Sequence, residues 1–205
     1  MKKLLLLFTL IFQNTMNAQV YYDVDNKIID REAFNNVLLD SRFYSVQNDS
    51  LKTSKIMFWN ERGEKGSLGD TKNLFKELNE KLNLKLDSNK PLIIYYYPGK
   101  DPCNSGGKYS VRREYLKSDK QLLKKVKAIG EVNVLRVYKN KEGLTTINDH
   151  DWKKDPNGLI ENLFFNYDYW CESFVIINQD KYSAFFGEYP HDEVTKALKE
   201  ILTKP

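Results

Sequence analysis

Residues 91–103 read Pro-Leu-Ile-Ile-Tyr-Tyr-Tyr-Pro-Gly-Lys-Asp-Pro-Cys, and this stretch decides the predicted fold. Six consecutive apolar and aromatic residues, 92–97, stand between two prolines, which rarely occur inside a sheet. A continuous apolar run of this length, without polar alternation, is typical of a strand that is buried on both faces. The sequence therefore predicts a central strand at 92–97 in an α/β protein.

Hydrophobic periodicity on both sides of this strand predicts the other elements. In chain order, the expected elements are a strand at 55–59, a glycine-containing loop at 63–69, a helix at 71–86, the strand at 92–97, a helix at 118–130, a strand at 132–138, a helix at 155–164, strands at 174–177 and 182–186, and a helix at 190–202. The helix start at Ser118 is predicted from a capping box, because Gln121 follows three residues later. The last two strands are expected to be antiparallel and near an edge of the sheet.

This order of elements resembles that of the thioredoxin-like family. Residues 91–103 also resemble the family's strand that runs into a Cys-x-x-Cys turn. The resemblance covers residues 54–202. It implies a thioredoxin-like three-layer sandwich at 54–205, in which helices flank a mixed central sheet. It also implies that Cys103 and Cys171 lie at the same end of the sheet, where we expect them to form a disulfide.

The sequence departs from the family where the family's chemistry lies. Lys-Asp-Pro-Cys stands in place of Cys-x-x-Cys, so Lys100 occupies the position of the attacking cysteine, and no proline precedes the strand at 174–177. A lysine cannot replace a nucleophilic thiolate. Two functions follow as hypotheses. The first is a binding or accessory module, with an unknown protein as partner, that has lost dithiol chemistry. The second is an atypical thiol-disulfide oxidoreductase that uses Cys103, with Cys171 as the resolving cysteine.

The first 18 of the 205 residues are typical of a secretory signal peptide. Lys2 and Lys3 precede an apolar run at 4–12, and the small residue Ala18 ends a polar stretch. The run is too short to cross a bilayer, so no membrane anchor is expected. We expect a periplasmic or secreted protein, with an N-terminal hairpin and helix extension at 19–53. In an oxidising compartment the two cysteines either pair or leave one reactive thiol.

Charge and polar clusters indicate little further chemistry. Removing two lysines with the signal peptide lowers the net charge from +4 to +2, which predicts no nucleic-acid partner. Eight basic residues at 108–127 either favour a thiolate at Cys103 or form a solvated helix face. The cluster of Asp149, His150, Asp151 and Asp155 predicts a polar loop rather than a zinc site. His191 is expected to be exposed in the first turn of the last helix, and no cofactor or metal is expected.

Overall fold

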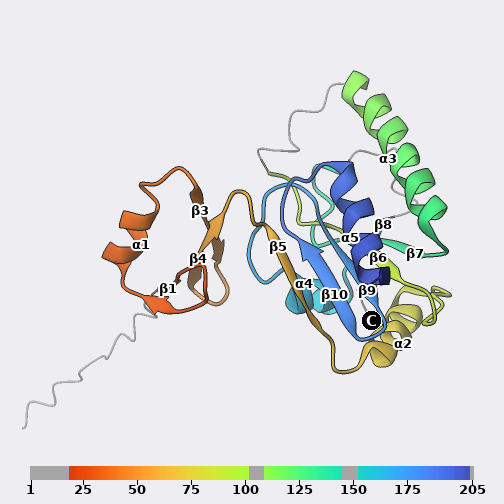
Figure 1. The fold of residues 1–205 in the computed structure, drawn as a ribbon, viewed down its shortest axis with the longest axis horizontal. Coiled ribbons are helices and arrows are strands. Elements are labelled where there is room, and N and C mark those ends of the chain that lie inside the picture. Colours follow the sequence, from red (N-terminus) through yellow and green to blue (C-terminus); the bar gives the residue numbers. More distant parts are fainter. Residues whose placement is uncertain (1–18, 102–108, 145–151, 204–205) are drawn as a thin grey trace, which may run out of the picture.

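The computed structural model describes residues 19–101, 109–144 and 152–203, with the side chains of 109–116 excepted. Over these residues the protein is a mixed α/β structure with two mixed sheets and five α-helices (Figure 1). The predicted α/β class is therefore confirmed. None of the helices in these ranges is long and apolar enough to cross a membrane.

The smaller sheet is built by the N-terminal part of the chain. Its strand order is β2-β1-β4-β3, formed by β1 (Val20–Tyr22), β2 (Ile28–Ile29), β3 (Phe43–Asn48) and β4 (Thr53–Phe58). The expected hairpin is present, since β1 and β2 are antiparallel, and the helix α1 (Arg31–Val37) follows it. Asp30 begins this helix because its carboxylate accepts the Ala33 N–H at 2.8 Å.

The larger sheet has the order β5-β10-β9-β6-β7-β8. Its strands are β5 (Gly63–Ser67), β6 (Leu92–Tyr97), β7 (Asn133–Tyr138), β8 (Trp152–Lys154), β9 (Ser173–Asn178) and β10 (Lys181–Phe185). The strands β6, β7 and β8 are parallel, whereas β9 is antiparallel to β6, and β10 is antiparallel to both β9 and β5. The prediction that 92–97 is central is confirmed, as is the antiparallel strand near an edge.

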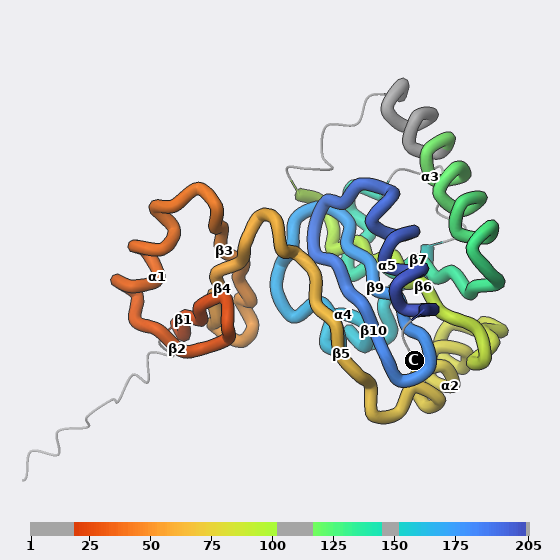
Figure 2. Tube along the Cα trace, in the orientation of Figure 1, coloured from red at the N-terminus to blue at the C-terminus, as the bar shows by residue number. Residues whose placement is uncertain are grey.

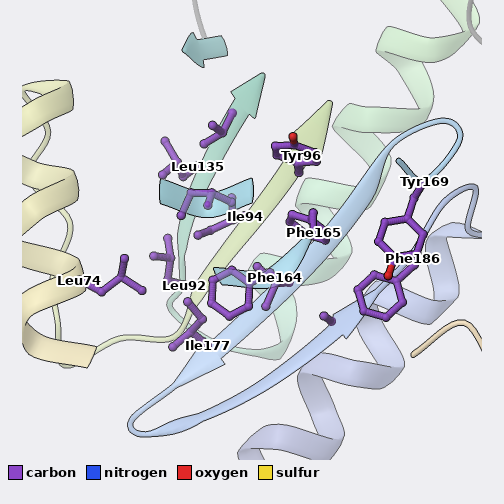
Figure 3. Close-up of a cluster of buried hydrophobic side chains, with 14 of the residues drawn as sticks. Leu74, Leu92, Ile94, Tyr96, Leu135, Phe164, Phe165, Tyr169, Ile177 and Phe186 are labelled. Carbon is purple, nitrogen blue, oxygen red and sulfur yellow. The ribbon is translucent and has the colours of Figure 1, made fainter. Parts of the chain in front are cut away.

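Side chains from β6 alternate between two hydrophobic clusters, because successive residues of a strand point to opposite faces. Leu92, Ile94 and Tyr96 belong to a cluster with residues of α2 (Thr71–Leu82) and α4 (Leu159–Phe164), shown in Figure 3. Ile93 and Tyr95 belong to a second cluster, with residues of α3 (Tyr109–Ile129) and α5 (His191–Thr203). Helices therefore cover both faces of the larger sheet.

The strand expected at 55–59 exists as β4, but it belongs to the smaller sheet rather than to the parallel series of the larger one. The strand that pairs with β7 in the larger sheet is β8 instead. The sequence predicts a loop in this segment. Periodicity indicates that a segment is extended, but the choice of partner depends on residues far away in the chain.

The prediction of a loop at 63–69 is also wrong, because residues 63–67 form the edge strand β5. Gly66 lies opposite Tyr182 in the register, and a Cβ at Gly66 would stand 2.6 Å from the Tyr182 ring. The glycine that indicated a loop instead lets a large ring pack across the strand.

Helix α3 begins at Tyr109, nine residues before the predicted capping box. No glycine or proline occurs between 109 and 129, so nothing in the sequence stops the helix from extending toward its N-terminus. Ser118 therefore lies inside the helix. Its Oγ lies 3.1 Å from Nδ1 of His191, which joins α3 to the start of α5 and makes the expected exposed histidine a partly buried one.

The two sheets pack against each other, although Figure 2 shows the small sheet extending to one side of the molecule. Val46 and Met57 from the small sheet share a hydrophobic cluster with Tyr169 and Phe186. The Asp168 N–H also donates to the Gln47 carbonyl at 2.7 Å. The segment before β9 is thus held by both sheets, and this segment contains Cys171.

Candidate functional site

Cys171 lies in the segment between α4 and β9, and it is disulfide-bonded. Its backbone N–H donates to Asp101 Oδ2 at 2.6 Å. Asp101 follows β6 and stands two positions before Cys103, so the chain segments that carry the two cysteines meet here. Cys103 itself lies outside the described residues, and its pairing with Cys171 stays a prediction. The backbone at Cys171 has a φ of 65°, a left-handed conformation that L-residues seldom adopt.

The chain around Cys171 is tightly packed against the turn that follows β10. The Gly187 N–H donates to Ser173 Oγ at 2.9 Å, and Gly187 has a φ of 75°. A Cβ at Gly187 would stand 3.0 Å from the Trp170 carbonyl oxygen. Glycine is therefore required at 187 both by the backbone conformation and by the close approach of the neighbouring chain.

A groove with aromatic walls opens beside Cys171, where the small sheet meets the larger one. It is lined by Tyr44, Ser45, Val46, Trp59, Arg62, Asp168, Tyr169, Trp170, Cys171, Gly187 and Glu188, and it encloses about 70 Å³. Trp59 stacks on Tyr44 with 4.3 Å between ring centroids, yet 44% of Trp59 remains exposed. Trp170 is 63% exposed. Large exposed aromatic residues that share one hollow are typical of interaction sites.

A second hollow of about 260 Å³ lies on the other side of Cys171, toward α3 and α5. It is lined by Tyr95, Asp119, Leu122, Cys171, Glu172, Glu188, Tyr189 and His191. Asp119 is neutralised by Arg136, whose Nη2 donates to both carboxylate oxygens at 2.8 and 2.9 Å. Burial raises the pKa of the Tyr95 hydroxyl, and the nearby Glu172 charge adds to this effect. Its hydroxyl is therefore a neutral group at physiological pH.

The remaining predicted site residues do not join this region in the described part of the chain. Lys100 forms an ion pair with Glu142 at 3.5 Å, so its amine neutralises a neighbouring loop carboxylate. Asp155 caps α4, since its two carboxylate oxygens accept the Ile160 and Glu161 N–H groups at 3.0 and 2.9 Å. Burial raises the pKa of Asp155 above its ordinary value.

The rest of the polar cluster, Asp149, His150 and Asp151, lies outside the described residues, as does part of the basic segment at 108–127. Within the described ranges, no group of three or more histidine, cysteine, aspartate or glutamate residues is close enough to hold a metal ion. In the described portion of the basic segment, Lys117, Lys120, Lys124, Lys125 and Lys127 are all exposed on α3.

Sequence reasoning did not single out the residues that line the groove. Trp59 and Arg62 stand just after β4, and Trp170 comes just before Cys171. The available signal was the presence of a tryptophan at each of these junctions, because a large aromatic residue in a polar connecting segment is a candidate for binding. Nothing in the local sequence indicates that these junctions adjoin.

Comparison with known proteins finds no similar protein: no family model matches the chain, and neither does any curated protein or solved structure.

Proposed function

We propose that the larger sheet and its helices form a thioredoxin-like three-layer sandwich. The arrangement β6-α3-β7, with β6 and β7 parallel, supports this proposal, as does the antiparallel pair β9 and β10 beside β6. The helix pairs on opposite faces of the sheet support it further. The strands β5 and β8 then stand as additions at the two edges of this core.

We propose that the protein is an exported binding module that holds a segment of another protein in the groove beside Cys171. The observation that carries this function is the pair of exposed tryptophans, Trp59 and Trp170, in one groove. Tryptophan supplies a large contact area at a small cost in conformational entropy and dominates many protein interfaces. In this proposal the disulfide at Cys171 fixes the wall of the groove.

Dithiol chemistry is less well supported because Lys100 replaces the expected first cysteine, and its ammonium group is paired with Glu142. Cys171 is also held rigidly, by Asp101 through its N–H and by the packing of Trp170 against Gly187. A preorganised wall lowers the entropy cost of binding a partner.

Site-specific photo-cross-linking tests the proposed function. A photoreactive phenylalanine at position 170 should capture a discrete partner from the exported fraction of the native host. The same residue at Leu39, which is 86% exposed outside the groove, is the matched control. Unlabelled wild-type protein should compete for the adduct, and the Trp59→Ala variant should compete poorly. Equal adduct patterns at 170 and 39, or no adduct at 170, would contradict the proposal.

A second candidate function, an atypical thiol-disulfide oxidoreductase, is favoured by the left-handed backbone of Cys171. Uncommon backbone conformations of this kind cost free energy and are concentrated at functional sites. In this alternative an external thiol reductant first opens the disulfide. The Cys103 thiolate then attacks a substrate disulfide and releases one substrate thiol, and Cys171 attacks the mixed disulfide, which releases the second substrate thiol and forms a Cys103–Cys171 disulfide. A disulfide-reduction assay tests it, with the wild-type protein compared with Cys103→Ser. Activity that depends on Cys103 would support the oxidoreductase over the binding module.

Export is part of both proposals, and it rests on the signal peptide predicted at 1–18. N-terminal sequencing of the exported protein should therefore begin near Gln19. A sequence that begins with Met1 would contradict export by this route.

A further inference from the structure

Arg62, in the groove beside Cys171, carries a positive charge that no described carboxylate neutralises. No carboxylate of the described residues lies within ion-pair distance of its guanidinium, and the side chain makes no hydrogen bond with them. Its Nε is hidden from solvent and has no hydrogen-bond acceptor among the described residues. Because Nε is covered, a ligand in the groove can reach the guanidinium only through its two terminal Nη groups.

The guanidinium is nevertheless fixed in place by its neighbours. It stands 5.3 Å from the centroid of the Phe185 ring, a cation–π contact. It also lies beside Gly187, since a Cβ at that position would stand 3.5 Å from Nη1 of Arg62, an ordinary van der Waals distance. The Arg62 carbonyl also accepts the Phe186 N–H at 2.7 Å, which anchors the backbone at this position. The charge is therefore preorganised rather than freely mobile.

The size of the groove limits which ligand group can reach this charge. The groove encloses about 70 Å³, which is room enough for a carboxylate group. The remainder of a ligand would lie over the exposed faces of Trp59 and Trp170. Guanidinium and carboxylate are geometrically matched, because the planar fork of N–H groups can donate to both carboxylate oxygens.

We propose that Arg62 is the anchor for a carboxylate of the bound peptide segment, with Trp59 and Trp170 packing against the residues beside that carboxylate. This inference rests on the proposed binding function and names the chemistry that the groove selects. The carboxylate is that of the partner's C-terminus, and the test below includes an acidic side chain as the contrary outcome. Glu188 lines the same groove and is exposed, so its charge opposes the ligand and weakens binding.

Matched peptides test the inference on the purified wild-type protein. The probes are acetyl-Ala-Ala-Phe with a free C-terminal carboxylate, its C-terminal amide, and acetyl-Ala-Glu-Phe-amide. Binding is followed by the NMR signals of the tryptophan indole N–H groups, with buried Trp152 as the internal control. The free carboxylate should shift the Trp59 and Trp170 signals with an affinity about tenfold above that of the amide. Tight binding of the glutamate peptide instead would identify an acidic side chain as the source and contradict the C-terminal carboxylate.

Variants then assign the preference to one residue. Arg62→Gln should abolish the difference in affinity between the acid and amide peptides. Arg62→Lys should retain part of this difference, because lysine keeps the positive charge but lacks the planar pair of N–H donors. Glu188→Gln should tighten binding of the carboxylate peptide, a gain that no loss of folding could produce. Arg42→Gln, which removes an exposed guanidinium paired with Asp40, should change nothing in the groove.

Two further results would overturn the inference. If acid and amide peptides shift the two indole signals equally, the groove binds peptides without a carboxylate anchor, and the proposed binding function survives. If no peptide shifts either signal, the carboxylate anchor is wrong, and the cross-linking at position 170 decides separately whether the groove binds a partner protein.

Discussion

Cys171 donates its backbone N–H to the carboxylate of Asp101 at 2.6 Å, across 70 positions of sequence. This bond joins the segment that leaves the central strand β6 to the segment that enters β9. Hydrogen bonds to a charged acceptor are among the stronger ones in proteins. The position of Cys171 is therefore set by a long-range polar contact in addition to its disulfide.

Removal of this acceptor should destabilise the protein. Asp101→Ala leaves the partly buried Cys171 N–H without its carboxylate, and we expect the free energy of unfolding to fall by about 1–3 kcal/mol. Denaturant unfolding measures the change. Asp49→Ala, at an exposed carboxylate of the small sheet, is the control and should stay within about 0.5 kcal/mol of wild type. Equal unfolding midpoints for the two variants would show that the Asp101 contact contributes nothing.

The predicted disulfide between Cys103 and Cys171 can be tested by thiol counting under denaturing conditions. We expect no free thiol in the oxidised protein and two after reduction. The cysteines stand 68 positions apart, so closing this loop should stabilise the fold by roughly 4 kcal/mol through the entropy of the unfolded chain. Two free thiols in freshly exported protein would refute the pairing.

The buried isoleucines of β6 should be essential to the core. Ile93 and Ile94 are fully buried on opposite faces of the sheet, so truncation of either to alanine should cost about 2–5 kcal/mol. Ile28, which is 72% exposed, is the matched control, and Ile28→Ala should change stability by less than about 0.5 kcal/mol. Wild-type unfolding midpoints for both core variants would place β6 outside the core.

Gly187 should tolerate no side chain. Gly187→Ala combines a φ of 75° with a Cβ 3.0 Å from the Trp170 carbonyl oxygen, and we expect a loss of about 1–3 kcal/mol. Gly69 has open space around its Cβ position, so Gly69→Ala should be nearly neutral. Thermal unfolding of the two variants makes the comparison. A Gly187→Ala variant as stable as Gly69→Ala would mean that the turn rearranges easily.

Tyr97 should make stability fall in alkaline solution. Burial raises the pKa of its hydroxyl to about 12, and this hydroxyl donates to the Glu142 carbonyl at 2.9 Å. In the unfolded chain the phenol ionises near pH 10, so the folded protein binds more protons from about pH 10 to 12. The free energy of unfolding must therefore decrease as the pH rises through this range.

Denaturant unfolding at several alkaline pH values measures this decrease. Tyr97→Phe should show a shallower decline than wild type, because the substituted residue has no proton to lose. Ile28→Ala, an exposed position that carries no titratable group, is the control and should keep the wild-type slope. Identical slopes for all three proteins would assign the alkaline loss of stability to other groups.

Local patterns in the sequence determined most of the regular and buried segments, although not the edge strands β5 and β8. The run at 92–97 predicts a central strand, because six consecutive apolar residues are all removed from water only when both faces of the strand are buried. The apolar stripe of the last helix and the antiparallel pair at its N-terminal side followed from the same local rules. Each of these predictions depends on the hydrophobic effect acting within a single element.

Tertiary structure alone decided which segments meet. Residues 55–59 were correctly predicted as extended, but their pairing with β1 and β3 rather than with the larger sheet depends on backbone partners elsewhere in the chain. The groove arises because this smaller sheet packs beside the segment before β9, which brings Trp59 and Arg62 to Trp170. Every strand presents the same backbone hydrogen-bonding groups, so the local sequence specifies that a segment is extended but not which strand it pairs with. The pairing is determined by burial of the complete hydrophobic core.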